Sequence, residues 1–443
     1  MRQSFSRIAI LVFALAAQLG AIHAQTAKPA AQVSEFDLNG MKVLIKQRPG
    51  APTVAAGLFF RGGVQNATAA NAGIEGFTLN VAAEGSKSYP RQKLRKDTAS
   101  VGTVISAGAN YDFSVLAFGC TKLSFDNSWK MFVDVALNPA FAPEDVERVR
   151  GNFLTGLRSQ ADSPEGSLEV LNQSILFAGH PYANSPQGTA ANITKFKAAD
   201  LAAYHRGMLQ TSRLLLVVVG DVDPAALQKQ VEASFGKLPR GDYKDSPPPA
   251  IVFAKGTVDV TAKSLETDYV KGSFAAPSLR EPDYYAMRVA MTLLQSSVFQ
   301  EVRVKRNLSY APDAELGERS ANTGSISVST DKPNEAIAVM LSEIQKLKQA
   351  PVDDDELRRM AGYFLTTYYL KEETNAAQVA ELAQYELMGG GWRKSLDFLA
   401  RVRSVTPAEI QAAANKYMKN IRFVVVGDPA DVDKAVFLRT SSN

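Results

Sequence analysis

The chain has 443 residues, of which 46% are hydrophobic and 21% are charged, and its formal net charge at pH 7 is +4. This length exceeds what one ordinary hydrophobic core serves, so it indicates two or more domains, and the composition excludes extended disorder. The weak positive charge gives no electrostatic reason to expect a nucleic acid as a partner.

Residues 1–24 have the pattern of a secretory signal peptide. Arg2 and Arg7 form a charged start, Ile8–Leu19 is an apolar core, and Ile22-His23-Ala24 is an acceptable cleavage site. A membrane anchor is the weaker alternative, because the apolar run is too short to span a bilayer. We therefore expect an exported protein without a membrane span after cleavage, periplasmic if the host is a bacterium with two membranes.

Strand-like and helix-like segments alternate along the first half of the chain. Thr53–Phe60 and Ser114–Cys120 are rich in apolar and aromatic residues, which predicts strands. Ala72–Ala83 carries apolar residues at helical spacing, and Asp145–Arg158 follows as a second predicted helix. The apolar run Leu214–Val219 predicts a buried strand. This pattern is typical of an α+β fold in which helices pack on a mainly antiparallel sheet.

Three short segments recur in the same order, at offsets between 207 and 211 residues. The pairs are Phe153–Thr155 with Phe364–Thr366, Ala199–Leu201 with Ala408–Ile410, and Val217–Asp221 with Val424–Asp428. A period of this length predicts two homologous domains. The segment Pro239–Ala250 is rich in proline and charge and predicts a linker. The expected parts are a signal peptide (1–24), an N-terminal domain (25–240), a linker (241–250) and a C-terminal domain (251–443).

Residues from about 34 to 435 resemble the pitrilysin/insulinase family of zinc peptidases, the inverzincins. The resemblance rests on short motifs in the family's order: Arg61-Gly62-Gly63, Gly85-Ser86 with Tyr89-Pro90, His180-Pro181-Tyr182 with Gly188-Thr189, and the two closing strands Thr211–Asp221 and Asn420–Asp428. It implies two domains of the same α+β fold and, in active members, a zinc-dependent peptidase.

The zinc site of the family does not survive in this sequence. Active members carry H-x-x-E-H on a helix, where the two His bind zinc and the Glu acts as general base, and a Glu on a later helix is the third ligand. The corresponding positions here are Gly76, Leu79, Asn80 and Gly156. Glycine and leucine have no lone pair for a metal, and an amide is a poor zinc donor. The resemblance therefore implies that this chain binds no zinc of its own.

Two glutamates flank these positions, and two histidines follow the expected cleavage site. We expect Glu75 and Glu84 to be exposed helix carboxylates, since charged side chains are mostly exposed. The alternative, a relocated metal or acid/base pair, needs a partner ligand that the sequence does not show.

His180 and His205 have no ligand-type partner three or four residues away, so their spacing predicts no replacement metal site.

A second family feature is retained in the C-terminal half. Active members use an Arg and a Tyr, spaced R-x6-Y, against the substrate carbonyl, and Arg303 and Tyr310 have this spacing. A guanidinium and a phenol are donors that can stabilise a developing oxyanion. We expect Arg303 near the end of a helix over Tyr285–Lys305 and Tyr310 at the start of a strand. The alternative is a surface arginine in a basic run and a tyrosine used for packing.

Two further segments are assigned from the resemblance. Ile105–Asn110 falls where the family has the edge strand that pairs with an extended peptide, so Ser106, Ala107 and Gly108 are candidate substrate contacts. An ordinary strand of small residues is an equal alternative. Met388–Trp392, with three consecutive glycines, is expected to be a flexible loop.

These features lead to two hypotheses about function. The first is a non-catalytic subunit of an exported heterodimeric zinc peptidase, whose partner, an H-x-x-E-H chain of the same family, supplies zinc and the general base for a peptide or unfolded polypeptide substrate. The second is a peptide-binding or scaffolding protein with no part in catalysis. A peptidase active by itself is disfavoured, because no cluster of ligands has usable spacing.

Overall fold

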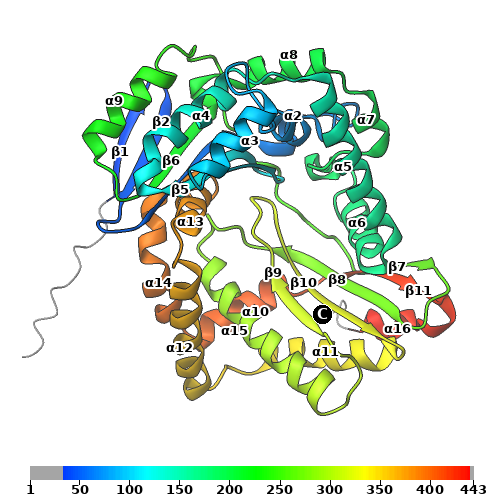
Figure 1. Ribbon diagram of the computed structural model, residues 1–443. Coiled ribbons are helices and arrows are strands. Elements are labelled where there is room, and N and C mark those ends of the chain that lie inside the picture. Colours follow the sequence, from blue (N-terminus) through cyan, green and yellow to red (C-terminus); the bar gives the residue numbers. More distant parts are fainter. Residues whose placement is uncertain (1–32, 440–443) are drawn as a thin grey trace, which may run out of the picture. The chain divides into compact units, whose positions relative to one another are not determined.

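The computed structural model describes residues 33–439 (Figure 1). The predicted signal peptide at 1–24 lies outside the described residues. Within residues 33–439, no helix combines the length and the apolar character that crossing a bilayer requires. Two sheets with helices packed on them confirm the predicted α+β class.

The first sheet has six strands in the order β1-β2-β6-β3-β5-β4. All neighbours are antiparallel except β2 and β6. The strands are β1 (Val33–Leu38), β2 (Met41–Gln47), β3 (Thr53–Arg61), β4 (Val104–Ala109), β5 (Phe113–Thr121) and β6 (Leu214–Gly220). The three strands predicted from the sequence correspond to β3, β5 and β6.

The second sheet has five strands in the order β7-β11-β8-β10-β9. Its strands are β7 (Thr257–Ala262), β8 (Asp268–Ala276), β9 (Asp313–Leu316), β10 (Asn322–Thr330) and β11 (Arg422–Gly427). Only β7 and β11 are parallel neighbours, so strand order and directions repeat those of β2-β6-β3-β5-β4. The duplication predicted from the sequence is therefore present in the topology of the two sheets.

The helices follow the same duplication. In the N-terminal half they are α2 (Ile74–Ala82), α3 (Arg91–Ser100), α4 (Phe125–Leu137), α5 (Pro143–Asp162), α6 (Pro164–Leu176), α7 (Ala190–Lys195), α8 (Ala198–Met208) and α9 (Pro224–Phe235). In the C-terminal half they are α10 (Tyr284–Val298), α11 (Pro333–Gln349), α12 (Asp354–Lys371), α13 (Asn375–Leu387), α14 (Phe398–Ser404), α15 (Pro407–Tyr417) and α16 (Lys434–Phe437). The two predicted helices are α2 and α5.

The two halves exchange one helix each (Figure 1). Leu168 of α6, from the N-terminal half, packs on Val424 and Val426 of β11 in the second sheet. Reciprocally, α13 from the C-terminal half packs on β3 and β6, with Leu382 in one apolar cluster with Val217. Because α13 covers one face of the first sheet and helices of its own half cover the other, every residue of β6 is buried.

The exchanged helices begin in the same way. The Ser163 hydroxyl accepts a hydrogen bond from the backbone of Gly166, and the Thr374 hydroxyl accepts one from Ala377. Each cap satisfies one of the free N–H groups of a first helical turn. These caps separate α6 from α5 and α13 from α12, and the second helix of each pair packs on the opposite sheet.

His205 provides the first prediction. Its side chain on α8 is buried, and its Nε2–H donates to the Ala136 carbonyl oxygen at 3.0 Å. Burial lowers the pKa of His205 to about 4. The unfolded chain takes up this proton near pH 6.5, so the free energy of unfolding falls as the pH drops from about 6.5 to about 4, by roughly 3 kcal/mol.

Urea titrations at several pH values measure this effect. The control is His205→Gln, whose amide can donate to the same carbonyl but does not titrate. We expect a smaller loss of stability between pH 6.5 and 4 in this variant. Equal pH dependence of the two proteins would contradict the assignment.

Candidate functional site

The degenerate zinc helix, α2, is held in place by the loop that follows α6. Gly73, which precedes the helix, has φ +88°, and Gly188 in that loop has φ +75°. A Cβ atom on either glycine would overlap the backbone of the other segment. The Asn192 side chain also donates to the Ala69 carbonyl at 2.9 Å. These contacts bring the loop directly against the first turn of α2.

The four aligned positions lie on adjacent helices but hold no ligand chemistry. Helix α5 packs on α2 through the rings of Phe77 and Phe153, whose centroids are 5.3 Å apart. Leu79 is 1% exposed within the core. The Asn80 amide donates back to the Gly76 carbonyl at 2.8 Å. Within residues 33–439, no three His, Cys, Asp or Glu side chains are placed to hold a metal ion.

The space at Gly76 is closed. A Cβ atom there would lie 3.1 Å from the Ala109 Cβ and 3.1 Å from the Pro186 carbonyl oxygen. By contrast, Gly156 on α5 is exposed, and no atom lies within 4 Å of its Cβ position. The aligned position on α2 is therefore crowded by the Ala109 side chain and the Pro186 backbone, while the aligned position on α5 is open.

Glu75 is a correction to the sequence-based expectation, because it is buried and not exposed. Only 6% of its surface is accessible. Its carboxylate accepts hydrogen bonds from the hydroxyls of Ser114 on β5 and Tyr204 on α8, the latter at 2.8 Å, and forms an ion pair with Arg213. Glu75 was expected to be exposed because charged side chains mostly are, but β5, α8 and the turn before β6 enclose it.

The charge of Glu75 affects the pKa values of both Arg213 and Tyr204. Burial disfavours the charged form of Arg213, but the Glu75 carboxylate outweighs this and raises the pKa of the guanidinium. Burial and the charge of Glu75 also raise the pKa of Tyr204. Arg213 donates through Nε to the Arg61 carbonyl at 3.2 Å and lies over the Tyr243 ring. We infer that this group fixes α2 to the sheet.

Glu84 also differs from the expectation of a simple exposed carboxylate. It is half-buried at the end of α2, and its carboxylate lies 2.5 Å from Arg148 and 3.2 Å from Arg91. The Asp145 carboxylate lies 2.9 Å from the same Arg148. Two carboxylates and two guanidinium groups thus connect α2, α3 and α5.

The structure brings Arg303 and Tyr310 together. Helix α10 ends at Val298 and continues as a π-helical turn over Phe299–Val304, whose last residues include Arg303. Asn307, with φ +51°, reverses the chain, so that the Arg303 guanidinium carbon lies 4.0 Å from the centre of the Tyr310 ring. Tyr310 is 78% exposed. It precedes β9, which begins at Asp313, so the expectation that Tyr310 opens the strand is wrong.

Strand β4 is the terminal strand of the first sheet and contains Ser106, Ala107 and Gly108. Among the described residues it pairs on one side only, with β5. A terminal strand has free main-chain donors and acceptors along its outer edge. The structure thus supplies the edge on which the predicted peptide contact depends.

The expectation of a flexible loop over Met388–Trp392 is wrong at both ends of the segment. Met388 and Trp392 are buried against the first sheet. The Trp392 indole N–H donates to Glu35 of β1 at 2.6 Å, and its backbone N–H donates to Glu386 at 3.1 Å. The glycines form a turn that returns the chain to the sheet, with φ values of +81° and +122° at Gly390 and Gly391.

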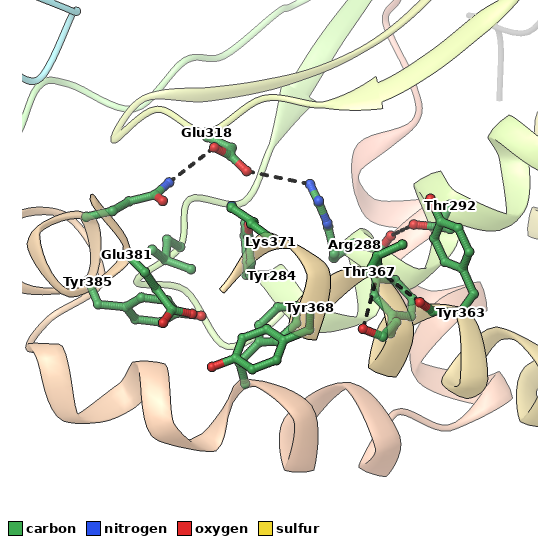
Figure 2. A pocket seen from close by; sticks show the side chains of 14 residues that line it. Tyr284, Arg288, Thr292, Glu318, Tyr363, Thr367, Tyr368, Lys371, Glu381 and Tyr385 are labelled. Atoms are coloured by element: carbon green, nitrogen blue, oxygen red, sulfur yellow. Dashed lines mark hydrogen bonds and ion pairs between the residues drawn. The ribbon is translucent and has the colours of Figure 1, made fainter. Parts of the chain in front are cut away.

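A cavity of about 170 Å³ in the C-terminal half was missed by the sequence analysis (Figure 2). It lies between α10, α12, α13 and α14, and six of its fourteen lining residues are aromatic. Its aromatic and charged lining residues are Tyr284, Arg288, Glu318, Tyr363, Phe364, Lys371, Tyr368, Glu381, Tyr385 and Phe398. The only sequence signal for this cavity was the group of tyrosines in α12. Until the packing of α13 and α14 is known, such tyrosines cannot be distinguished from residues that pack in a hydrophobic core.

Comparison with known proteins agrees with this fold. Residues 42–190 match the family model for Insulinase (Peptidase family M16), and residues 195–362 match the model for the Peptidase M16 inactive domain. The chain is 22% identical over 393 residues to an uncharacterized zinc protease of Streptomyces coelicolor, covering 85% of this chain and 84% of the relative. It is 23% identical over 422 residues to the mitochondrial-processing peptidase subunit beta of Blastocladiella emersonii, covering 90% and 89%.

The fold is also shared with solved structures. A peptidase M16 inactive domain from Pseudomonas fluorescens superposes with a TM-score of 0.83 at 19% identity, covering 90% of this chain and 98% of that one. The two family models, in order along the chain, and the repeated topology of the two sheets lead to one conclusion. The chain belongs to the M16 (insulinase) family of peptidases, and the positions that carry zinc ligands in active members hold glycine and asparagine here.

Proposed function

We propose that this chain is the non-catalytic subunit of an exported heterodimeric zinc peptidase. The observation that carries the proposal is the contrast between the two halves. Helix α2 has lost its ligand residues and is closed at Gly76, whereas Arg303 and Tyr310 keep their spacing and lie together at the surface. The similarity to a named subunit of a processing peptidase supports an assembly of two chains.

In this assembly the chain contributes binding and charge stabilisation. An extended peptide adds to the outer edge of β4 by main-chain hydrogen bonds, and the small side chains of Ser106 to Gly108 leave room for its side chains. The Arg303 guanidinium and the Tyr310 hydroxyl donate to the carbonyl oxygen as negative charge develops on it. The partner, an H-x-x-E-H chain, supplies the zinc and the general base.

Reconstitution with such a partner tests the proposal. We expect no peptidase activity from the chain alone and activity from the mixture. Arg303→Ala is expected to lower kcat/KM of the mixture by roughly 10²- to 10³-fold, the usual effect of removing one oxyanion donor. The matched control is Arg306→Ala, three residues away, whose guanidinium is already paired with Glu301 at 2.5 Å.

Unchanged activity in the Arg303→Ala mixture would contradict the assigned role. A partner that binds without any gain of activity would instead support the second hypothesis, a peptide-binding or scaffolding protein.

A further inference from the structure

The cavity of the C-terminal half has a buried acidic end and an exposed end. Glu381 of α13, 9% exposed, lines the buried end together with Tyr284 and Tyr385. Lys371, Glu318 and Tyr363, which also line the cavity, are exposed. Figure 2 shows Glu381 beside Tyr368 and Tyr385, with Glu318 across the cavity from them.

Of the charges that line the cavity, Glu318 and Arg288 are already paired with each other. Glu318 lies 3.9 Å from Arg288 and accepts a hydrogen bond from Gln384 at 3.4 Å. At the buried end, by contrast, no lysine or arginine nitrogen among residues 33–439 lies within 4 Å of the Glu381 carboxylate. Glu381 is therefore a carboxyl group without a direct ion-pair partner at the buried end of the cavity.

A second buried carboxyl group stands behind Glu381. Glu372, the residue after α12, is 8% exposed, and apart from a proton shared with Glu381 neither of its oxygens has a hydrogen-bond donor. A buried polar group without a partner costs free energy that a ligand can recover. The pair thus has no direct ion-pair partner among the described residues, and its member Glu381 lines a cavity to which six tyrosine and phenylalanine side chains also contribute.

Aromatic faces and a carboxylate together are the recognition elements for an organic cation. The volume of about 170 Å³ lies below the 300–1,000 Å³ typical of cavities for drug-sized ligands, so one side chain fits and a whole cofactor does not. We propose that this cavity binds one basic side chain, arginine or lysine, of a peptide, with its cation against Glu381 and its stem between the tyrosine rings. This inference rests on the proposed function, because it names the peptides that the subunit selects.

Binding of the cation is coupled to release of a proton. Burial and the neighbouring Glu372 carboxylate raise the pKa of Glu381 to about 8. The charged and titratable groups that face the pair are Lys46 of β2, Arg48 beyond its end, Tyr368 and Lys371 of α12, and Tyr385 of α13. The ligand cation takes the place of the proton on Glu381. The affinity of the cavity for this cation therefore rises by as much as tenfold per pH unit as the pH increases to about 8, and stays constant at higher pH.

The test uses the purified full chain without its partner. Its probes are two short capped peptides, identical except that one carries arginine and the other citrulline, which has the same shape but no charge. Titration by calorimetry at pH 8 is expected to show at least tenfold tighter binding of the arginine peptide. Equal binding of the two peptides would overturn the proposal.

Two variants locate the interaction. Glu381→Gln keeps the shape of the side chain and is expected to abolish the preference for arginine, whereas Glu373→Gln, at an exposed position beside the buried pair, is expected to preserve it. Equal losses in both variants would show a long-range charge effect and overturn the proposal.

A third variant, Glu372→Gln, is expected to flatten the pH dependence of arginine-peptide binding between pH 6 and 8, and an unchanged slope would contradict the shared proton. None of these results depends on the partner, so loss of reconstituted activity and loss of arginine binding are separate outcomes.

Discussion

Replacing Arg213 by methionine is expected to lower the free energy of unfolding by about 3–5 kcal/mol, because it leaves the buried Glu75 carboxylate without its cation. The remaining partners of Glu75, the hydroxyls of Ser114 and Tyr204, donate hydrogen bonds but do not neutralise its charge. Chemical denaturation at pH 7, followed by circular dichroism, measures the difference.

Two further variants separate the loss of the ion pair from the loss of packing. The double change Glu75→Gln with Arg213→Met removes the unpaired charge and is expected to recover a large part of the stability. Arg358→Met removes an arginine from an exposed pair with Asp355 and is expected to cost less than about 1 kcal/mol. A similar effect of Arg213→Met and Arg358→Met would show that Glu75 is not held by charge.

Restoring the family residues at the four degenerate positions is expected not to restore a zinc site. The quadruple change combines Gly76→His, Leu79→Glu, Asn80→His and Gly156→Glu. At position 76, the Cβ atom of a histidine would already lie 3.1 Å from the Ala109 Cβ and from the Pro186 carbonyl oxygen, before the ring is placed. At position 79, a glutamate would replace Leu79, which is 1% exposed in the core. The partners that orient ligands in a working site would also be missing.

We expect no stoichiometric zinc after dialysis and a loss of several kcal/mol in the free energy of unfolding, from overpacking and a buried charge. Metal analysis and thermal melting measure the two quantities. Gly156→Glu alone is the control: its side chain enters open space, and replacing a helical glycine gains roughly 0.5 kcal/mol. One zinc per chain at micromolar affinity would show that the α2 side of the site is still adaptable.

Much of the fold could be predicted because it depends on local patterns. The strands β3, β5 and β6 and the helices α2 and α5 follow from apolar runs and helical spacing, and the duplication follows from three recurring segments. The proximity of Arg303 and Tyr310 is also local, since one turn at Asn307 closes the seven-residue spacing. The roles of these two residues and of β4 in substrate binding remain predictions.

The predictions that were wrong, for Glu75 and for Trp392, have a common cause that is not local. Glu75 was expected at the surface because charged side chains are mostly exposed, but three other elements enclose it and supply its partners. Trp392 was expected in a mobile loop because of the three glycines before it, but its ring is anchored to β1, which precedes it by more than 350 residues. Both misassignments concern contacts between residues far apart in the chain.

The sequence by itself determined the fold class and the duplication, because both are a matter of residue type and spacing. Its resemblance to the zinc peptidases also indicated the loss of ligand residues at Gly76, Leu79, Asn80 and Gly156. Only the tertiary structure decided that α6 and α13 exchange sheets, that the space at Gly76 is closed, and that Glu372 and Glu381 stand buried beside an aromatic cavity. The physical reason is that burial and electrostatic environment are set by which elements pack together, and no local pattern records this.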